Sequence, residues 1–213
     1  LEYGTGIIEG VDDVRSPRST LIAISTPTDI SNPEFISSAT VLGLHVIDDR
    51  ATVGDSLGFG PEQAEFSIDN DPFQLYTGSF SITAEGMHTI RYFSTDLVGN
   101  QEAIQISTVI VDNTPPSSPI LPLADGRNPS PWKSSETYTF SWSNPPDLSG
   151  IAGAYIKRDH PPTFSDEGFF REGVSSVSYT GWYSLGANLV YLWLRDKAGN
   201  ADASTAETVT IRF

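Results

Sequence analysis

The sequence of 213 residues contains no cysteine, a single methionine and only 12 basic residues. Without cysteine there is no disulfide framework, no thiol nucleophile and no cysteine-ligated zinc. No stretch reaches the roughly 20 consecutive apolar residues of a membrane helix. The most apolar run, Ile104 to Val111, is interrupted by Gln105, Ser107 and Thr108. These absences exclude several enzyme and metal classes and predict no membrane insertion.

The charge is strongly negative, at −15, because 27 acidic residues face the 12 basic ones. Binding to nucleic acid or to an anionic membrane relies on Lys and Arg, so we expect neither partner. The acidity is concentrated in residues 1–113, which hold 17 acidic and four basic residues, whereas residues 114–213 hold ten and eight. Any cation site is therefore expected in the first part of the chain.

A repeated motif is the most informative feature that the sequence does contain. An alternating apolar segment followed by Asp-x-x-Gly-Asn occurs at 90–100 and again at 190–200. One more β-rich run follows each copy. Between the copies, the proline-rich segment 112–119 cannot donate the amide protons of a continuing strand. The sequence therefore predicts two domains, at 1–113 and 114–213, with residues 1–20 as a linker or an added strand.

The rest of the chain is typical of β-structure. In residues 137–142, Tyr138, Phe140 and Trp142 alternate with small polar residues, which places the three rings on one face of a strand. Short strands recur between Gly, Pro, Asn and Asp clusters, and no segment shows a helical apolar period. Two units of about 100 residues fit an all-β fold of two tandem immunoglobulin-like β-sandwiches. We assign Tyr138, Phe140, Trp142 and Trp193 to the core.

Four segments of the first domain carry a resemblance: Phe66–Phe73, Glu85–Tyr92, Asp96–Glu102 and Val111–Pro116. Through them, residues 60–116 resemble the bacterial immunoglobulin-like repeats of secreted and cell-surface proteins, of the OmpL47 or chitobiase C-terminal-like type. Residues 132–213 are similar to a fibronectin type III or bacterial immunoglobulin-like module, through Trp142, Asp147–Ile151 and Tyr191 two residues before Trp193. The resemblance implies an extracellular structural, adhesive or spacer module, and no catalytic residues.

The Asp-x-x-Gly-Asn motif has a structural interpretation. The Asp side chain accepts amide protons from the following residues, and Gly and Asn tolerate a left-handed backbone. The motif therefore predicts a tight turn before the last strand of each domain. The alternative is calcium, because Asp and Asn oxygens are hard-cation ligands. The six residues concerned are Asp96, Gly99, Asn100, Asp196, Gly199 and Asn200.

For calcium, the better candidates are acidic residues of the first domain. Calcium needs roughly six to eight oxygen ligands, which loops at the ends of strands can supply. The candidates are Asp48 and Asp49, Asp55, and Asp69 and Asp71 in the run Asp69-Asn70-Asp71. A solvated turn is the alternative for Asp69 to Asp71. No other cofactor is expected.

The segment Gly54–Gly58 matches both Gly-x-Ser-x-Gly and the Gly-Asp-Ser-Leu motif of some esterases. That chemistry needs a strand-to-helix turn and a histidine base, and neither is indicated here. The three histidines, His45, His88 and His160, show no metal-binding or catalytic spacing. We therefore expect no enzymatic activity.

Aromatic residues provide one further candidate. Tyr179, Trp182 and Tyr183 lie close together in sequence, and Trp132 lies in a polar loop. If exposed, such rings could stack on sugars; the alternative is packing in the core.

The expected function is a non-enzymatic structural, spacer or adhesion module of a larger secreted or cell-surface protein. The chain starts at Leu1 with no leader, which suggests a piece or a mature form. Expected partners are other domains of the same protein, and also a second copy, a host or matrix protein, or a glycan. Gly6 to Val11 is a candidate strand for addition to a neighbouring sheet. The alternative function is a carbohydrate-binding accessory region of a polysaccharide-active enzyme.

Overall fold

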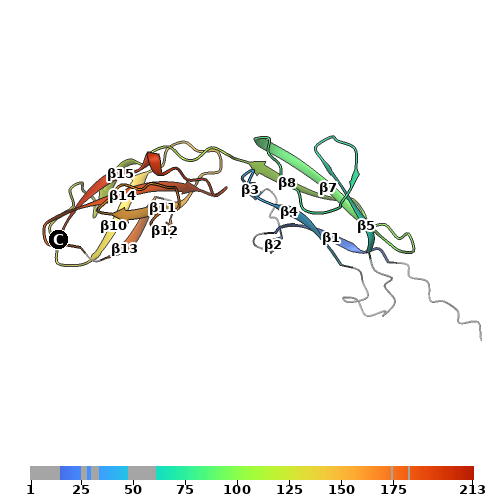
Figure 1. Ribbon diagram of the computed structural model, residues 1–213, viewed down its shortest axis with the longest axis horizontal. Helices are drawn as coiled ribbons and strands as arrows, with labels where there is room; N and C mark the ends of the chain where they lie inside the picture. The colour runs from blue at the N-terminus through green and yellow to red at the C-terminus, as the bar shows by residue number, and fades with distance from the viewer. Residues whose placement is uncertain (1–14, 25–27, 30–33, 48–60, 174, 182) are drawn as a thin grey trace, which may run out of the picture. The chain divides into compact units, whose positions relative to one another are not determined.

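The computed structural model describes residues 15–24, 28–29, 34–47, 61–173, 175–181 and 183–213 (Figure 1). In this part of the chain the only regular structure besides strands is one 3-10 turn, η2 (Ala203–Thr205). No helix of the described residues is long and apolar enough to cross a membrane. The predicted all-β fold class is confirmed.

The chain divides into two compact units. The first unit contains Leu1–Glu34, Ala39–Ile82 and Met87–Val109. The second contains Ile110–Phe213 together with two short segments from earlier in the chain, Phe35–Ser38 and Thr83–Gly86. These limits differ in detail from the single division expected after residue 113, because the two short segments are grouped with the second unit.

Two sheets build the first unit, one with the order β2-β1-β4 and the other with the order β3-β8-β7-β5-β6. The last residues of β3 and β8 are grouped with the second unit. The strands are β1 (Arg18–Ala23), β2 (Thr28–Asp29), β3 (Glu34–Ile36), β4 (Leu42–Ile47), β5 (Pro61–Ile68), β6 (Gln74–Leu75), β7 (Gly86–Asp96) and β8 (Gln105–Val111).

The core of the first unit follows the two-residue period of its strands. In the antiparallel pair of β5 and β7, Phe66 lies opposite Tyr92 and Ala64 lies opposite Ser94. All four side chains are buried, as expected when every second residue points to the same face. Phe66 also stacks on Phe80, with ring centroids 4.4 Å apart.

A buried carboxylate connects the two sheets of the first unit. Glu102 is only 8% exposed, and its carboxylate accepts hydrogen bonds from residues on strands of both sheets. Ser19 on β1 donates its backbone N–H (3.0 Å to Oε1) and its hydroxyl. Ser94 on β7 also donates its backbone N–H (2.9 Å) and its hydroxyl (2.6 Å). In a sandwich without a disulfide, Glu102 provides a hydrogen-bonded connection between the sheets.

Replacing Glu102 by Ala should lower the stability of the first unit by about 2–4 kcal/mol, because the buried donors of Ser19 and Ser94 lose their acceptor. Gln101, next to it and exposed, is the matched control. Chemical denaturation of the whole chain measures both variants. Equal stability of Glu102→Ala and Gln101→Ala would contradict the role assigned to this carboxylate.

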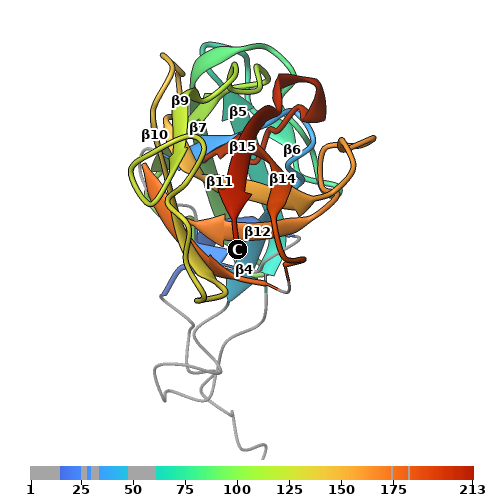
Figure 2. The same cartoon turned by 90° about the vertical axis from the view of Figure 1, so that its left-hand side faces the viewer.

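The second unit also has two sheets, with the orders β13-β10-β9 and β12-β11-β14-β15 (Figures 1 and 2). Figure 2 views this unit from the end at which the chain finishes. Its strands are β9 (Ile120–Ala124), β10 (Thr137–Ser143), β11 (Ile151–Arg158), β12 (Phe169–Glu172), β13 (Ser176–Thr180), β14 (Ala187–Asp196) and β15 (Glu207–Arg212).

Alternating residues of these strands form the core of the second unit. Tyr138, Phe140 and Trp142 of β10 are buried together against Val190 and Leu192 of β14. The three aromatic residues lie where the sequence pattern predicts them. Trp193 is also fully buried, but it follows Leu192 on the strand and so points to the opposite face of its sheet.

A strap, defined here as residues 159–168, covers that opposite face. Trp193 stacks on Tyr155 of the neighbouring strand, with ring centroids 5.3 Å apart, and its indole N–H donates to the carbonyl of Ser165 in the strap. The strap is fastened by an ion pair between Lys157 and Glu167. The hydrogen bonds from Lys157 and from the backbone N–H of Thr163 lower the pKa of Glu167 to about 2. The sheet therefore has an apolar layer on each side.

Two buried tyrosines of the second unit differ in their hydroxyl groups. The Tyr138 hydroxyl donates to the carbonyl of Arg212 at 2.8 Å, whereas the Tyr183 hydroxyl has no hydrogen-bond partner among the described residues. Burial raises the pKa of both phenols, and in Tyr183 repulsion from Tyr179 adds to it. A buried donor without a partner costs free energy that its removal recovers.

Tyr183→Phe should therefore leave stability unchanged or raise it, whereas Tyr138→Phe should lower it by about 1 kcal/mol, the usual net contribution of a hydrogen bond. The two substitutions remove the same atom from the same core, so each serves as the control of the other. Thermal unfolding by calorimetry compares them, and an equal loss in both variants would contradict this interpretation.

Candidate functional site

The two Asp-x-x-Gly-Asn segments form corners with the same internal hydrogen bonds. In the first unit, Asp96 Oδ1 accepts from the backbone N–H of Asn100 at 2.8 Å, and Oδ2 accepts from the Asn100 side chain at 2.8 Å. In the second unit, Asp196 makes the same two bonds to Asn200, at 2.7 and 2.8 Å. The glycine of each corner has a positive φ, near 95°, which a side chain rarely tolerates.

The electrostatic surroundings of the two corners differ. Burial opposes ionisation of Asp96, but hydrogen bonds from Asn100, Val98 and Gly99 outweigh it and lower the pKa of this carboxyl. Burial also opposes ionisation of Asp196, whose pKa is raised despite its bonds to Asn200. Repulsion from Asp147 and Asp112 adds to this effect. The second corner is therefore part of an acidic cluster that the first corner lacks.

This acidic cluster consists of Asp112, Asp147 and Asp196, each of which has a carboxylate oxygen within 4.8 Å of the others. Asp112 and Asp196 are buried and Asp147 is partly buried. Each residue belongs to a local turn sequence: Asp112 precedes the proline segment, Asp147 precedes Ser149-Gly150, and Asp196 begins the corner.

Hydrogen bonds join the three segments of the cluster. The backbone N–H of Ser149 donates to Asp112 Oδ2 at 3.0 Å. The Asn200 side chain donates both to Asp196 and to the backbone carbonyl of Asp112, at 2.8 Å each. Asp147 Oδ1 accepts from the backbone N–H of Gly150 at 2.8 Å. These bonds join three segments of the second unit, to which Asp112 also belongs.

Carboxylates this close repel one another, so the cluster favours either a retained proton or a cation. Burial, followed by the repulsion from Asp112, raises the pKa of Asp147 despite its bond from Gly150. Oxygen atoms of this kind are the ligands that hard cations prefer. Asp112, Asp147 and Asp196 are the group of described residues able to hold a metal ion.

The calcium candidates chosen from the sequence lie elsewhere. Asp48 and Asp49 fall outside the described residues, as do Asp55 and the serine of the Gly-Asp-Ser-Leu segment. Asp69 Oδ2 contacts His88 Nδ1 at 2.8 Å, and Asp69 Oδ1 accepts from the backbone N–H of Thr89 at 2.9 Å. These bonds, the one from Thr89 first, lower its pKa.

Asp71 is exposed, and neither it nor Asp69 belongs to a carboxylate group of the described part of the chain that could hold a metal. The turn alternative describes their local geometry better. Of the acidic cluster, only Asp112 comes from the acid-rich part, residues 1–113, whereas Asp147 and Asp196 come from residues 114–213. Calcium binding by this protein stays a prediction.

The aromatic candidates are divided between core and surface. Tyr179 and Tyr183 are only 6% and 9% exposed and belong to the core of the second unit. The prediction that they form a sugar-stacking patch is therefore wrong, since neither ring offers a free face. Trp182 lies outside the described residues. Trp132, by contrast, is 63% exposed.

Sequence reasoning missed the acidic cluster, because Asp112 and Asp147 were noticed only as parts of a linker and of a repeat motif. A weak signal was present. All three residues begin short Asp-initiated turns that contain Gly or Pro, but their sequence positions do not show that these turns meet.

No family model matches the chain, and no curated protein matches it. Among solved structures, the fibronectin(III)-like modules of Clostridium thermocellum CbhA match with a TM-score of 0.50 and 13% identity, over 90% of this chain and 93% of that one. The fold is that of fibronectin type III modules. The FN1–FN3 domains of chicken CNTN1 also match, with a TM-score of 0.47 and 9% identity, over 88% and 70% of the two chains.

The raised pKa values predict the effect of removing one charge from the cluster. A carboxyl whose pKa is higher in the folded state favours folding below its unfolded pKa, and this contribution is lost as the pH rises through the folded pKa. In the presence of a chelator, Asp147→Asn should therefore raise the melting temperature of the second unit by a few degrees at pH 7. At pH 4 and below, the difference from the wild type should shrink towards zero.

Asp166→Asn removes the same charge from an exposed position of the second unit and is the matched control. Calorimetry across this pH range compares the three proteins. A lower melting temperature for Asp147→Asn at pH 7, with Asp166→Asn unchanged, would contradict the repulsion described here.

The same two variants test the calcium prediction. A ligand that binds only the folded state must raise the melting temperature. If calcium binds at the cluster, millimolar calcium raises the melting temperature of the wild type and of Asp166→Asn but not that of Asp147→Asn. Equal melting temperatures of the wild type in chelator and in calcium would contradict calcium binding.

Proposed function

We propose that this chain is a non-enzymatic structural module that holds or presents other parts of a larger secreted or cell-surface protein. The observation that carries the proposal is the division of the chain into two compact β-units with the fold of fibronectin(III)-like modules. Compact units of this kind suit a spacer better than a flexible tether of Gly and Ser does.

Pro115 and Pro116 support the same function. Thr114 donates its backbone N–H to Asp112 Oδ1 at 3.1 Å, and Pro116 is buried. Proline restricts its own backbone and that of the preceding residue, so Pro115-Pro116 limits the backbone conformations of this segment.

The described residues also favour a non-catalytic role. Their histidines are dispersed: His45 and His160 are exposed, and His88 contacts Asp69. Fibronectin type III-like modules of other proteins share the fold. As part of the proposal, we assign the first unit to the OmpL47 or chitobiase C-terminal-like repeats, on the segments given above. Secretion, adhesion and binding to a matrix protein belong to the same proposal.

Force spectroscopy on the chain held at both ends tests the spacer function. A module that bears load should extend in two unfolding events, each releasing about 100 residues or roughly 350 Å. Glu102→Ala should lower the force of one event and leave the other unchanged, because Glu102 connects the sheets of the first unit only. Extension without resolved events, or one event for the whole chain, would contradict the proposal.

A further inference from the structure

Trp132 is an exposed ring on an ordered loop of the second unit. The loop runs from β9 to β10, and the Trp132 side chain is 63% exposed. Tryptophan has the largest side chain, and leaving most of it in water forgoes much of the free energy that burial would gain. The exposure therefore needs an explanation from the loop or from a ligand.

The loop is firmly attached to the last strand. The backbone N–H of Ser130 donates to the carbonyl of Thr210 at 2.8 Å, and the backbone N–H of Arg212 donates to Ser130 Oγ at 2.9 Å. The backbone N–H of Thr210 also donates to Asn128 Oδ1 at 3.0 Å. On the other side of Trp132, Lys133 forms an ion pair with Asp125 at 2.5 Å and lies 4.1 Å from the centroid of the Tyr138 ring.

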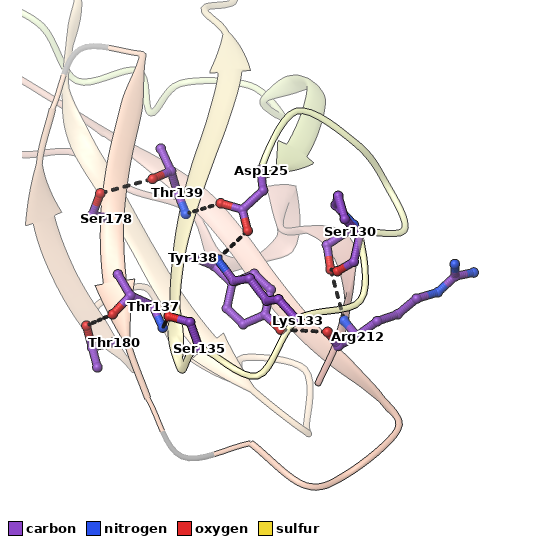
Figure 3. A network of polar contacts seen from close by, with 11 residues as sticks. Asp125, Ser130, Lys133, Ser135, Thr137, Tyr138, Thr139, Ser178, Thr180 and Arg212 are labelled. Carbon is purple, nitrogen blue, oxygen red and sulfur yellow. Dashed lines mark hydrogen bonds and ion pairs between the residues drawn. The ribbon is translucent and has the colours of Figure 1, made fainter.

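Figure 3 shows the ion pair of Lys133 with Asp125 and the hydrogen bonds that Arg212 makes with Ser130 and Tyr138. The residues on both sides of Trp132 are held, so its exposure does not result from a loose loop. The ring is presented in a fixed position, which lowers the entropy that a partner would have to remove on binding.

A guanidinium group accompanies the exposed ring. The Arg212 Cζ atom lies 5.7 Å from the centroid of the Trp132 ring. The guanidinium makes no hydrogen bond or ion pair with any residue in the described ranges, and Figure 3 shows the side chain extending away from the network. The backbone of Arg212 is nevertheless fixed by its bonds to Ser130, Lys133 and Tyr138. The guanidinium, which has no polar partner among the described residues, therefore lies over one face of an indole ring that is 63% exposed.

We propose that Trp132 and Arg212 form a binding site for an acidic polysaccharide, that is, for a pyranose unit that carries a carboxylate. The electropositive C–H face of a pyranose packs on the negative face of an indole. A carboxylate that projects from the sugar ring then accepts two parallel hydrogen bonds from the guanidinium. The site goes beyond the spacer function, which stands whether or not a sugar binds.

The surroundings favour a sugar over a protein partner. The residues next to Trp132 in the loop are Pro131, Lys133, Ser134 and Ser135, which are mostly polar. Protein interfaces need a larger contiguous surface. The net charge of the chain does not oppose a polyanion here, because residues 114–213 carry only −2 and charges further than about 8 Å are screened at physiological salt.

Titration of the whole chain with polygalacturonate, followed by calorimetry, tests this site. A neutral galactan and polyglutamate are the comparison polymers. We expect binding to polygalacturonate that is weakened about tenfold or more in Trp132→Ala, the equivalent of at least one lost stacking contact. Arg212→Gln should weaken binding to polygalacturonate to the level of the galactan.

Phe164→Ala and Lys197→Gln are the matched controls. Phe164 is a similarly exposed aromatic residue in the strap, at 58%. Lys197 follows Asp196 at the far end of β14, whereas Arg212 pairs with Ala187 at its start. Neither variant should change binding. Because all four side chains are at least partly exposed, melting temperatures should stay the same and show that the variants fold.

Three results would overturn the site. The first is no binding of polygalacturonate at millimolar sugar concentration. The second is unchanged binding by Trp132→Ala. The third is equal binding of polyglutamate and polygalacturonate, which would show attraction to charge alone. Selective binding of polygalacturonate that both site variants lose and both controls retain would support it.

Discussion

Buried carboxylates that accept hydrogen bonds from backbone N–H groups fix the corners between strands and connect the sheets in this structure. Asp96 and Asp196 close the corner before the last strand of each unit, and Glu102 connects two sheets. Asp112 accepts a backbone N–H from Ser149 and so joins two turns of the second unit. In a chain without cysteine, these acceptors supply specific, directional contacts where many small sandwiches have a cystine. Part of the large acidic excess is therefore structural and is not available on the surface.

The same hydrogen-bonded corner is accompanied by opposite pKa shifts of its aspartate in the two units. The Asp96 carboxylate has hydrogen-bond donors around it and belongs to no acidic cluster of the described residues, so it is stabilised as an anion. The Asp196 carboxylate has the same donors but also faces Asp112 and Asp147. A repeated sequence motif thus fixes the backbone of a corner, while residues distant in sequence determine the charge state of its aspartate. Likewise, Glu102 connects two sheets, but Asp202, at the matching position of the second copy, caps η2 through Ser204.

Local pattern was sufficient for the all-β fold, for the inward faces of β10 and β14, and for the Asp-x-x-Gly-Asn segments as a repeated feature. It failed where side chains from distant segments meet. Ser19 and Glu102 are 83 residues apart, and the acidic cluster joins three separate turns. Neighbouring aromatic residues also gave the wrong expectation for Tyr179 and Tyr183, because proximity in sequence does not tell which face of the sandwich a ring occupies.

The strap has a consequence for β14. Most strands of an antiparallel sandwich have one face in the core and one face in solvent, so apolar and polar residues alternate along their sequence. The strap and the stacked rings bury the second face around Trp193, which explains why Leu192, Trp193 and Leu194 are all buried although successive side chains point to opposite faces. Amide protons in the middle of this strand are shielded from both sides, so their exchange with solvent deuterium should require the second unit to unfold as a whole.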